Sequence, residues 1–97
     1  MSAEISDITI NYEEEGVLLV KELDKEVLSK GAWTTIIFRY QQWDRKKEAY
    51  GSEQYTIRRY RKMSGQYRQQ SKFNISSRDQ AARIVDILAR WLQAPEA

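Results

Sequence analysis

Cationic and aromatic side chains alternate along the middle of this 97-residue chain, a combination suited to a ligand that carries both phosphates and flat rings. Residues 33–83 contain twelve Lys and Arg against four Asp and Glu, a net charge of +8. Nine aromatic residues lie in the same segment. Cations attract phosphates, and aromatic rings stack on unpaired bases. This pattern is typical of a surface that binds single-stranded nucleic acid.

Acidic residues concentrate outside this basic segment. Residues 1–32 carry three Lys against eight acids, a net charge of −5, and the whole chain is left at +2. Three of these acids are consecutive, Glu13–Glu15. Consecutive side chains of an extended segment point to alternating faces, so three carboxylates in a row cannot all converge on one metal ion. We interpret them as a charged linker.

The chain contains no cysteine and no histidine. This excludes disulfides, zinc sites built on those ligands, and nucleophilic mechanisms that need Cys or a Ser-His-Asp triad. Asp44 and Glu48 lie among cations in a polar loop, and we interpret them as balancing local charge rather than as an acid–base pair. We therefore expect a protein that is not an enzyme and that needs no metal or cofactor.

The length of the chain predicts a single domain. We expect an acidic, loosely docked N-terminal arm over residues 1–16, one domain over 17–93 and a short tail over 94–97. No apolar run is long enough to span a bilayer, and the N-terminus lacks the basic-then-apolar pattern of a signal peptide. The expected location is the cytoplasm, with no membrane partner.

Four segments have the composition of β-strands, rich in β-branched and aromatic residues. They are Val17–Leu28, Trp33–Trp43, Gln54–Lys62 and Tyr67–Ile75. Polar and apolar residues do not alternate cleanly around Asp24, which predicts an irregularity there. Ser64–Gly65 between the last two segments has the composition of a two-residue hairpin turn.

The hydrophobic period changes from two to 3.6 after the fourth strand. Apolar residues then recur at helical spacing: Ala81, Ile84, Val85, Leu88, Trp91 and Leu92. Ser76 or Ser77 can cap this helix, with Asp79 or Gln80 at the capping-box spacing, and the helix must end before Pro95. We expect Ile84, Val85, Leu88 and Trp91 to form core or dimer contacts. The predicted fold is α+β, a four-stranded antiparallel sheet followed by one C-terminal helix.

Alternation along the strands predicts that one sheet face covers the helix and that the other is exposed. Ile36, Phe38 and Tyr40 form the expected inward set of the second strand, and the reverse assignment of its two faces stays open as an alternative. The expected exposed face presents Trp33, Arg39, Trp43, Arg58, Tyr60, Lys62, Arg68 and Lys72. On this interpretation, bases would stack on rings set among cations. Two simpler interpretations stay open: large aromatics often belong to the core, and edge strands often carry cations that only face solvent.

Three short sequences occur at corresponding places in a known family. They are Lys30–Gly31 followed by Trp33, the run Tyr55–Tyr60, and Lys72–Ser76 at the approach to the helix. Together with the order of elements they resemble the positive-cofactor-four single-stranded-DNA-binding coactivators, in particular bacterial members, and more distantly the plant Whirly proteins. The resemblance implies a homodimer in which the helices pack together. It also implies a set of contacting residues, namely Lys30, Trp33, Arg58, Tyr60 and Lys72.

The leading hypothesis is a non-catalytic protein that binds single-stranded nucleic acid in transcription, replication or repair. DNA is favoured over RNA, although no feature of the sequence distinguishes the two sugars. The alternative is an adaptor of the same fold that has lost nucleic acid binding and meets an acidic protein partner through its basic face. The acidic N-terminal residues and the small net charge fit this second hypothesis.

Overall fold

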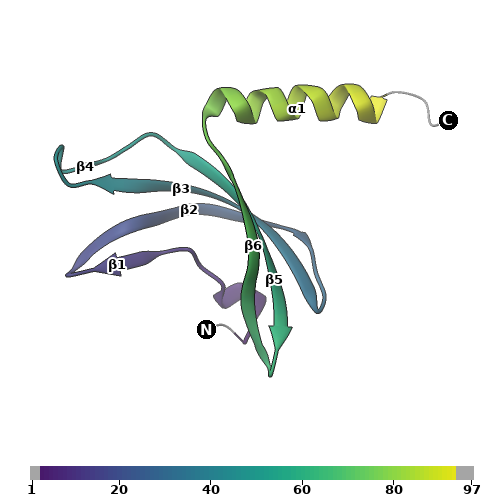
Figure 1. The fold of residues 1–97 in the computed structure, drawn as a ribbon, viewed down its shortest axis with the longest axis horizontal. Helices are drawn as coiled ribbons and strands as arrows, with labels where there is room; N and C mark the ends of the chain where they lie inside the picture. Colours follow the sequence, from purple (N-terminus) through teal and green to yellow (C-terminus); the bar gives the residue numbers. More distant parts are fainter. Residues whose placement is uncertain (1–2, 94–97) are drawn as a thin grey trace.

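The computed structural model describes residues 3–93, which form one curled antiparallel sheet followed by a C-terminal helix (Figure 1). The elements are η1 (a 3₁₀ turn, Ile5–Asp7), β1 (Tyr12–Glu14), β2 (Val17–Ser29), β3 (Trp33–Asp44), β4 (Ala49–Tyr50), β5 (Gln54–Met63), β6 (Gln66–Ile75) and α1 (Arg78–Gln93). The strand order is β1-β2-β3-β5-β6, and β4 pairs with β3. The α+β class is therefore confirmed, and the short strands β1 and β4 add to the four predicted ones.

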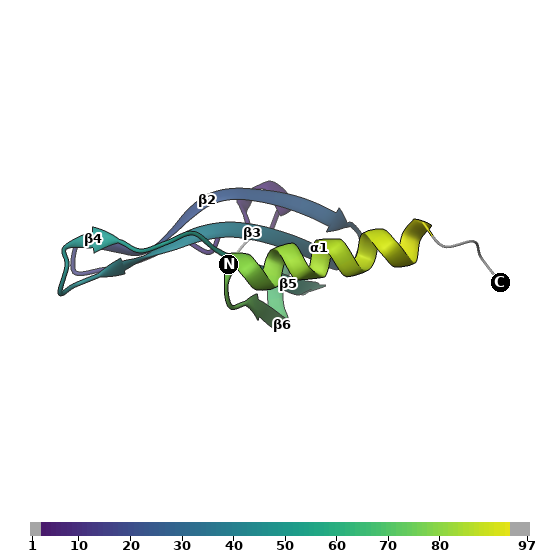
Figure 2. The ribbon, with the colours of Figure 1, turned by 90° about the horizontal axis from the view of Figure 1, so that it is seen from above.

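Irregular pairing bends the long strands. The register between β2 and β3 shifts between Glu22 and Asp24, where the sequence predicted an irregularity. A second shift lies near the end of β2, and a third interrupts the pairing of β5 with β6. Bulges of this kind bend a strand and increase its twist. As a result the β3–β4 end and the β5–β6 hairpin point in different directions (Figure 1), and β2 and β3 arch when seen from above (Figure 2).

The turn between β5 and β6 has the predicted chemistry. Ser64 and Gly65 have φ values of 53° and 76°, and Met63 pairs directly with Gln66 across them. A two-residue hairpin with both central residues at positive φ follows the right-handed twist of its strands, and glycine adopts that conformation without strain. The turn therefore fixes the register of the hairpin at its closed end.

The hydrophobic core lies against one face of the sheet, which we call the inner face. Its central side chains are Ile36 and Phe38 of β3, which are 0% and 1% exposed. The full cluster comprises Ile8, Ile10, Ile36, Phe38, Tyr40 and Tyr60. The predicted inward set of β3 is thus confirmed. The opposite side of the sheet, which carries Trp33 and Ile37, is called the outer face.

The N-terminal segment is docked on the inner face, in contrast to the loose arm expected from its acidity. Ile8 and Ile10 are among the most buried side chains of the chain. The Lys25 ammonium donates hydrogen bonds to the carbonyls of Ile5, Ser6 and Ile8, which holds the segment against β2. Burying an isoleucine contributes about 1.5–3 kcal/mol. The acidic side chains on either side stay exposed, so docking does not require them to lose their hydration.

Helix α1 begins at the predicted cap but does not pack flat on the sheet. The Gln80 N–H donates to Ser77 Oγ at 3.0 Å, and Gln80 Oε1 accepts from the Ser76 N–H at 2.6 Å. The helix then extends beyond the end of β6 (Figure 1). None of its sixteen residues, all within the described part of the chain, is buried. The expectation that one sheet face covers the helix is therefore wrong, because the capped two-residue connection directs α1 away from the sheet.

Within residues 3–93, no helix combines the length and the apolar character needed to cross a membrane.

Candidate nucleic-acid interface

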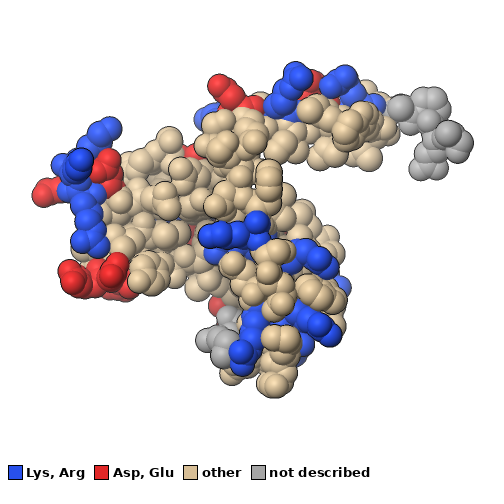
Figure 3. All heavy atoms as spheres, in the orientation of Figure 1, with Lys and Arg blue, Asp and Glu red and all other residues tan. Residues whose placement is uncertain are grey.

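Positive charge is concentrated on the hairpin formed by β5 and β6, residues 54–75, which we call the cationic hairpin. It has no Asp or Glu, and its six cations are Arg58, Arg59, Arg61, Lys62, Arg68 and Lys72. No salt bridge joins any of them to an acid within residues 3–93. In the space-filling view, Lys and Arg gather over this hairpin with hardly any acid between them (Figure 3). The hairpin therefore carries a net charge of +6 that its own residues do not compensate.

One part of the predicted platform lies on the inner face. Arg58 of β5 is opposite Ile36 of β3, and Tyr60 is opposite Thr34. Residues that face each other across an antiparallel pair project from the same side of the sheet. Lys72 of β6, opposite Arg58, shares this side, as does Lys62 by alternation along β5. Tyr60 is only 6% exposed, so the ring predicted to stack on bases belongs to the core.

The other part of the predicted platform lies on the outer face. Trp33 is opposite Arg61, which in turn is opposite Arg68 of β6. Arg59 and Arg39 share this face by alternation along their strands. The prediction of one common face is therefore wrong. The reason is register: moving β5 by one residue against β3 exchanges its two faces, and a polar loop of unknown path left that register open in the sequence.

The Trp33 ring contacts two arginines that are not in the predicted set of contacting residues. The Cζ atoms of Arg59 and Arg61 lie 4.3 Å and 5.3 Å from the centroid of the Trp33 ring. Guanidinium groups at these distances are attracted to the ring face. Trp33 is 40% exposed, so the cluster is accessible to a ligand. Only the strand register could have revealed it, because Trp33 and the two arginines are far apart in the chain.

Arg58 is partly enclosed, whereas the other inner-face cations, Lys62 and Lys72, are exposed. Arg58 Nη1 donates to Gln69 Oε1 at 3.0 Å, whereas its Nε is buried and has no hydrogen-bond partner among the described residues. Burial raises the pKa of Tyr60 above its ordinary value, and the charge of Arg58 partly offsets that rise. Tyr60 is therefore a neutral phenol at physiological pH.

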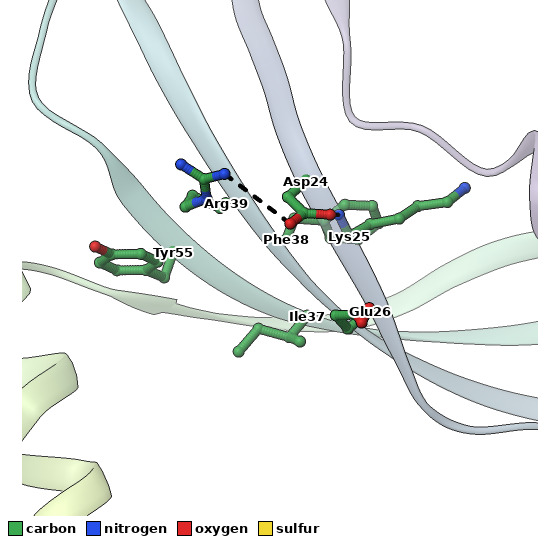
Figure 4. Close-up of a pocket in the computed structure, with 7 residues that line it drawn as sticks. All are labelled: Asp24, Lys25, Glu26, Ile37, Phe38, Arg39 and Tyr55. Carbon is green, nitrogen blue, oxygen red and sulfur yellow. Dashed lines mark hydrogen bonds and ion pairs between the residues drawn. The ribbon is translucent and has the colours of Figure 1, made fainter.

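Arg39 lies opposite Tyr55 of the cationic hairpin but, unlike the hairpin cations, it has acidic partners. Its Nη1 lies 2.9 Å from Glu53 Oε1, and its Nη2 lies 3.9 Å from Asp24 Oδ2. The hydrogen bond and the charge of Glu53 raise the pKa of Arg39. Figure 4 shows Arg39 pointing toward Asp24 across a shallow depression that Tyr55 also lines. The charge of Arg39 is locally balanced, which leaves it little attraction for a phosphate.

Two further predicted contacts lie in different settings. Trp43 makes an edge-to-face contact with Tyr50, with ring centroids 5.0 Å apart, near the far end of β3. Lys30 is exposed in the turn between β2 and β3. The Tyr67 hydroxyl donates to the carbonyl of Gly31 at 3.2 Å, which holds that turn next to the cationic hairpin. Lys30 can therefore act with the hairpin, whereas Trp43 packs elsewhere.

Like charges face each other on both sides of the cationic hairpin. Arg58 is opposite Lys72 on the inner face, and Arg61 is opposite Arg68 on the outer face. Like charges directly across a strand pair destabilise a sheet. Because the hairpin contains no acid to offset either pair, it retains a repulsion that a bound polyanion would relieve.

Comparisons with known proteins identify no relative: no family model, no curated protein and no solved structure matches the chain. In residues 3–93, no group of three acidic side chains is arranged to hold a metal ion. The functional proposal accordingly depends on the hairpin and on the helix.

Proposed function

We propose that this protein binds single-stranded nucleic acid without catalysing a reaction, and that DNA is its favoured ligand. The observation that carries the proposal is the pair of like-charge contacts on the two faces of an acid-free hairpin. A nucleic acid backbone would neutralise these cations and release its condensed counterions, which is the main source of sequence-independent affinity.

The distribution of charge favours a flexible ligand. β6 is the last strand in the sheet order, so the hairpin has a free edge between its two cationic faces. A single strand can pass around that edge and reach both faces. Duplex DNA has a persistence length of about 50 nm and would contact one face at a time. We therefore expect duplex to bind more weakly than a single strand of equal length.

The order of four long strands and one helix supports the resemblance to the positive-cofactor-four coactivators. On that basis the proposed role is in transcription, replication or repair. The resemblance also suggests a homodimer, and we propose that α1 is its interface.

The apolar stripe of α1 supports this dimer. Val85, Leu88 and Trp91 are 67%, 47% and 69% exposed along a helix of about 24 Å. An amphipathic helix whose apolar stripe is exposed to water is typical of a surface that packs against another helix. Leu88→Glu should therefore convert the dimer to a monomer in analytical ultracentrifugation. Arg90→Gln, on the polar side of the same helix, is the matched control and should leave the mass unchanged. A monomeric wild-type protein at high micromolar concentration would contradict the dimer.

The binding proposal is tested by fluorescence anisotropy of a labelled oligo-thymidine strand at several salt concentrations, with duplex as competitor. Each phosphate contact lowers the slope of log K against log salt by about 0.7 for a single strand. Replacing Arg58 and Lys72 together by Gln should make the slope shallower by about 1.4. Lys46→Gln with Lys47→Gln, which removes the same charge from the loop after β3, is the control and should change it little.

The outcomes separate the two functional hypotheses. Salt-dependent binding that duplex fails to displace, with a shallower slope only for the hairpin variant, is the result expected here. Equal slopes for the hairpin and loop variants would show that net charge alone drives binding. No binding at low salt would exclude the proposal and leave the adaptor that meets an acidic protein.

A further inference from the structure

We infer that Arg59, Arg61 and Arg68 form a phosphate clamp on the outer face, and that Trp33 positions this clamp instead of stacking on a base. The inference rests on the proposed function, because it specifies which part of the nucleic acid the outer face recognises. It replaces the role that the sequence suggested for Trp33.

The geometry around Trp33 carries the inference. Two guanidinium groups, from Arg59 and Arg61, already lie against its ring at 4.3 Å and 5.3 Å. At these distances the two guanidinium groups occupy ring surface that a stacking base would need. A guanidinium that rests on a ring uses its flat face, so its N–H groups at the rim stay available to phosphate oxygens. The cluster therefore offers donors to a phosphate more readily than a ring face to a base.

The third arginine extends the clamp across the hairpin. Arg68 lies directly opposite Arg61, and no acid within residues 3–93 forms an ion pair with Arg59, Arg61 or Arg68. This distinguishes them from Arg39, which shares the outer face but is paired with Glu53 and Asp24. Arginine binds phosphate through two parallel N–H···O bonds, so three unpaired guanidiniums on adjacent strands suit a phosphodiester chain.

Trp33 would act by limiting the motion of the two arginines. A free arginine side chain loses much of its rotamer freedom when it binds, and a side chain already resting on a ring loses less. Trp33 is thus a positioning residue whose removal weakens phosphate binding without any loss of base contact. This gives a distinguishing consequence: affinity should depend on the phosphate backbone and hardly on whether bases are present.

The test compares an oligo-thymidine strand with an abasic strand of the same length and the same number of phosphates. Wild-type protein should bind the two within about a factor of two. Trp33→Leu should weaken binding of both strands by the same factor. Arg59→Gln with Arg61→Gln should weaken both strands and make the salt slope shallower by about 1.4. The matched control is Trp43→Leu, because Trp43 lies on the same strand as Trp33 but contacts Tyr50. This variant should bind both strands with unchanged affinity.

A base stacked on Trp33 would produce a different result. Wild-type protein would then bind the abasic strand about 5- to 150-fold more weakly, and Trp33→Leu would remove that difference. This outcome would overturn the clamp. Unchanged oligo-thymidine binding by the double arginine variant would also overturn it, while the proposed function would stand through the inner-face cations. Failure of wild-type protein to bind either strand would instead reject the proposed function itself. The arginine variants and the two ligands still decide the question if Trp33→Leu does not fold.

Discussion

The docking of the N-terminal segment can be tested at Ile8. This side chain is 3% exposed and packs in the cluster that contains Ile36 and Phe38. Ile8→Ala removes three carbons, which is about 2.4 kcal/mol at about 0.8 kcal/mol for each buried methylene. Incomplete collapse of the resulting cavity adds to this loss, and buried Ile→Ala changes cost about 2–5 kcal/mol. We expect the free energy of unfolding to fall by about 3 kcal/mol.

The assay is urea unfolding followed by circular dichroism, at one fixed protein concentration because a dimer would make stability depend on concentration. Leu28→Ala is the matched control, since it also removes three carbons but from a side chain that is 57% exposed. Exposed positions of this kind usually change stability by less than about 0.5 kcal/mol. If Ile8→Ala destabilised the protein no more than Leu28→Ala, the segment would not be part of the core and the reasoning would be refuted.

Two further predictions concern the cationic hairpin. Burial raises the pKa of Tyr60, so as the pH rises this side chain ionises in the unfolded chain before it ionises in the folded protein. The contribution of neutral Tyr60 to stability is therefore complete below pH about 10 and is lost as the pH rises through the folded-state pKa. Tyr60→Phe should make alkaline unfolding less steep, and an unchanged profile in pH-jump urea titrations would contradict this. Arg68→Gln removes the repulsion with Arg61 but leaves the contact of Arg61 with Trp33 in place, so it should raise the free energy of unfolding by up to about 1 kcal/mol while weakening oligo-thymidine binding. A loss of stability in thermal unfolding would show that the two like charges do not repel each other measurably.

Under the proposed function, the same repulsion would connect the stability of the hairpin with ligand binding. A hairpin at the edge of a sheet benefits from a few cations that prevent edge-to-edge aggregation. Placing like charges directly opposite each other goes beyond that need and lowers stability. Sites that bind charged ligands commonly retain such destabilising arrangements, because ligand binding relieves them. The Arg68 prediction tests this trade-off directly.

Local chemistry was enough to predict the strands, the hairpin turn and the start of the helix. The bounds of the four long strands differ from the prediction by one residue at most, because β-branched and aromatic runs end at polar or glycine-containing segments. The hairpin turn at Ser64–Gly65 and the helix cap formed by Ser77 with Gln80 were also predictable, because each involves only residues close together in the chain. By contrast, β1 and β4 were missed, since strands of two or three residues exist only where a longer strand offers them partners.

The sequence by itself determined the charge of the hairpin, the alternation within each strand and the amphipathic stripe of α1, because each depends on residues close together in the chain. Tertiary structure decided which strand faces point the same way. It placed Tyr60 in the core, moved Arg59 and Arg61 next to Trp33, and docked Ile8 on the inner face. These outcomes depend on the register between strands joined by long loops and on burial by distant segments. A one-residue change of register exchanges the two faces of a strand, and local periodicity does not specify it.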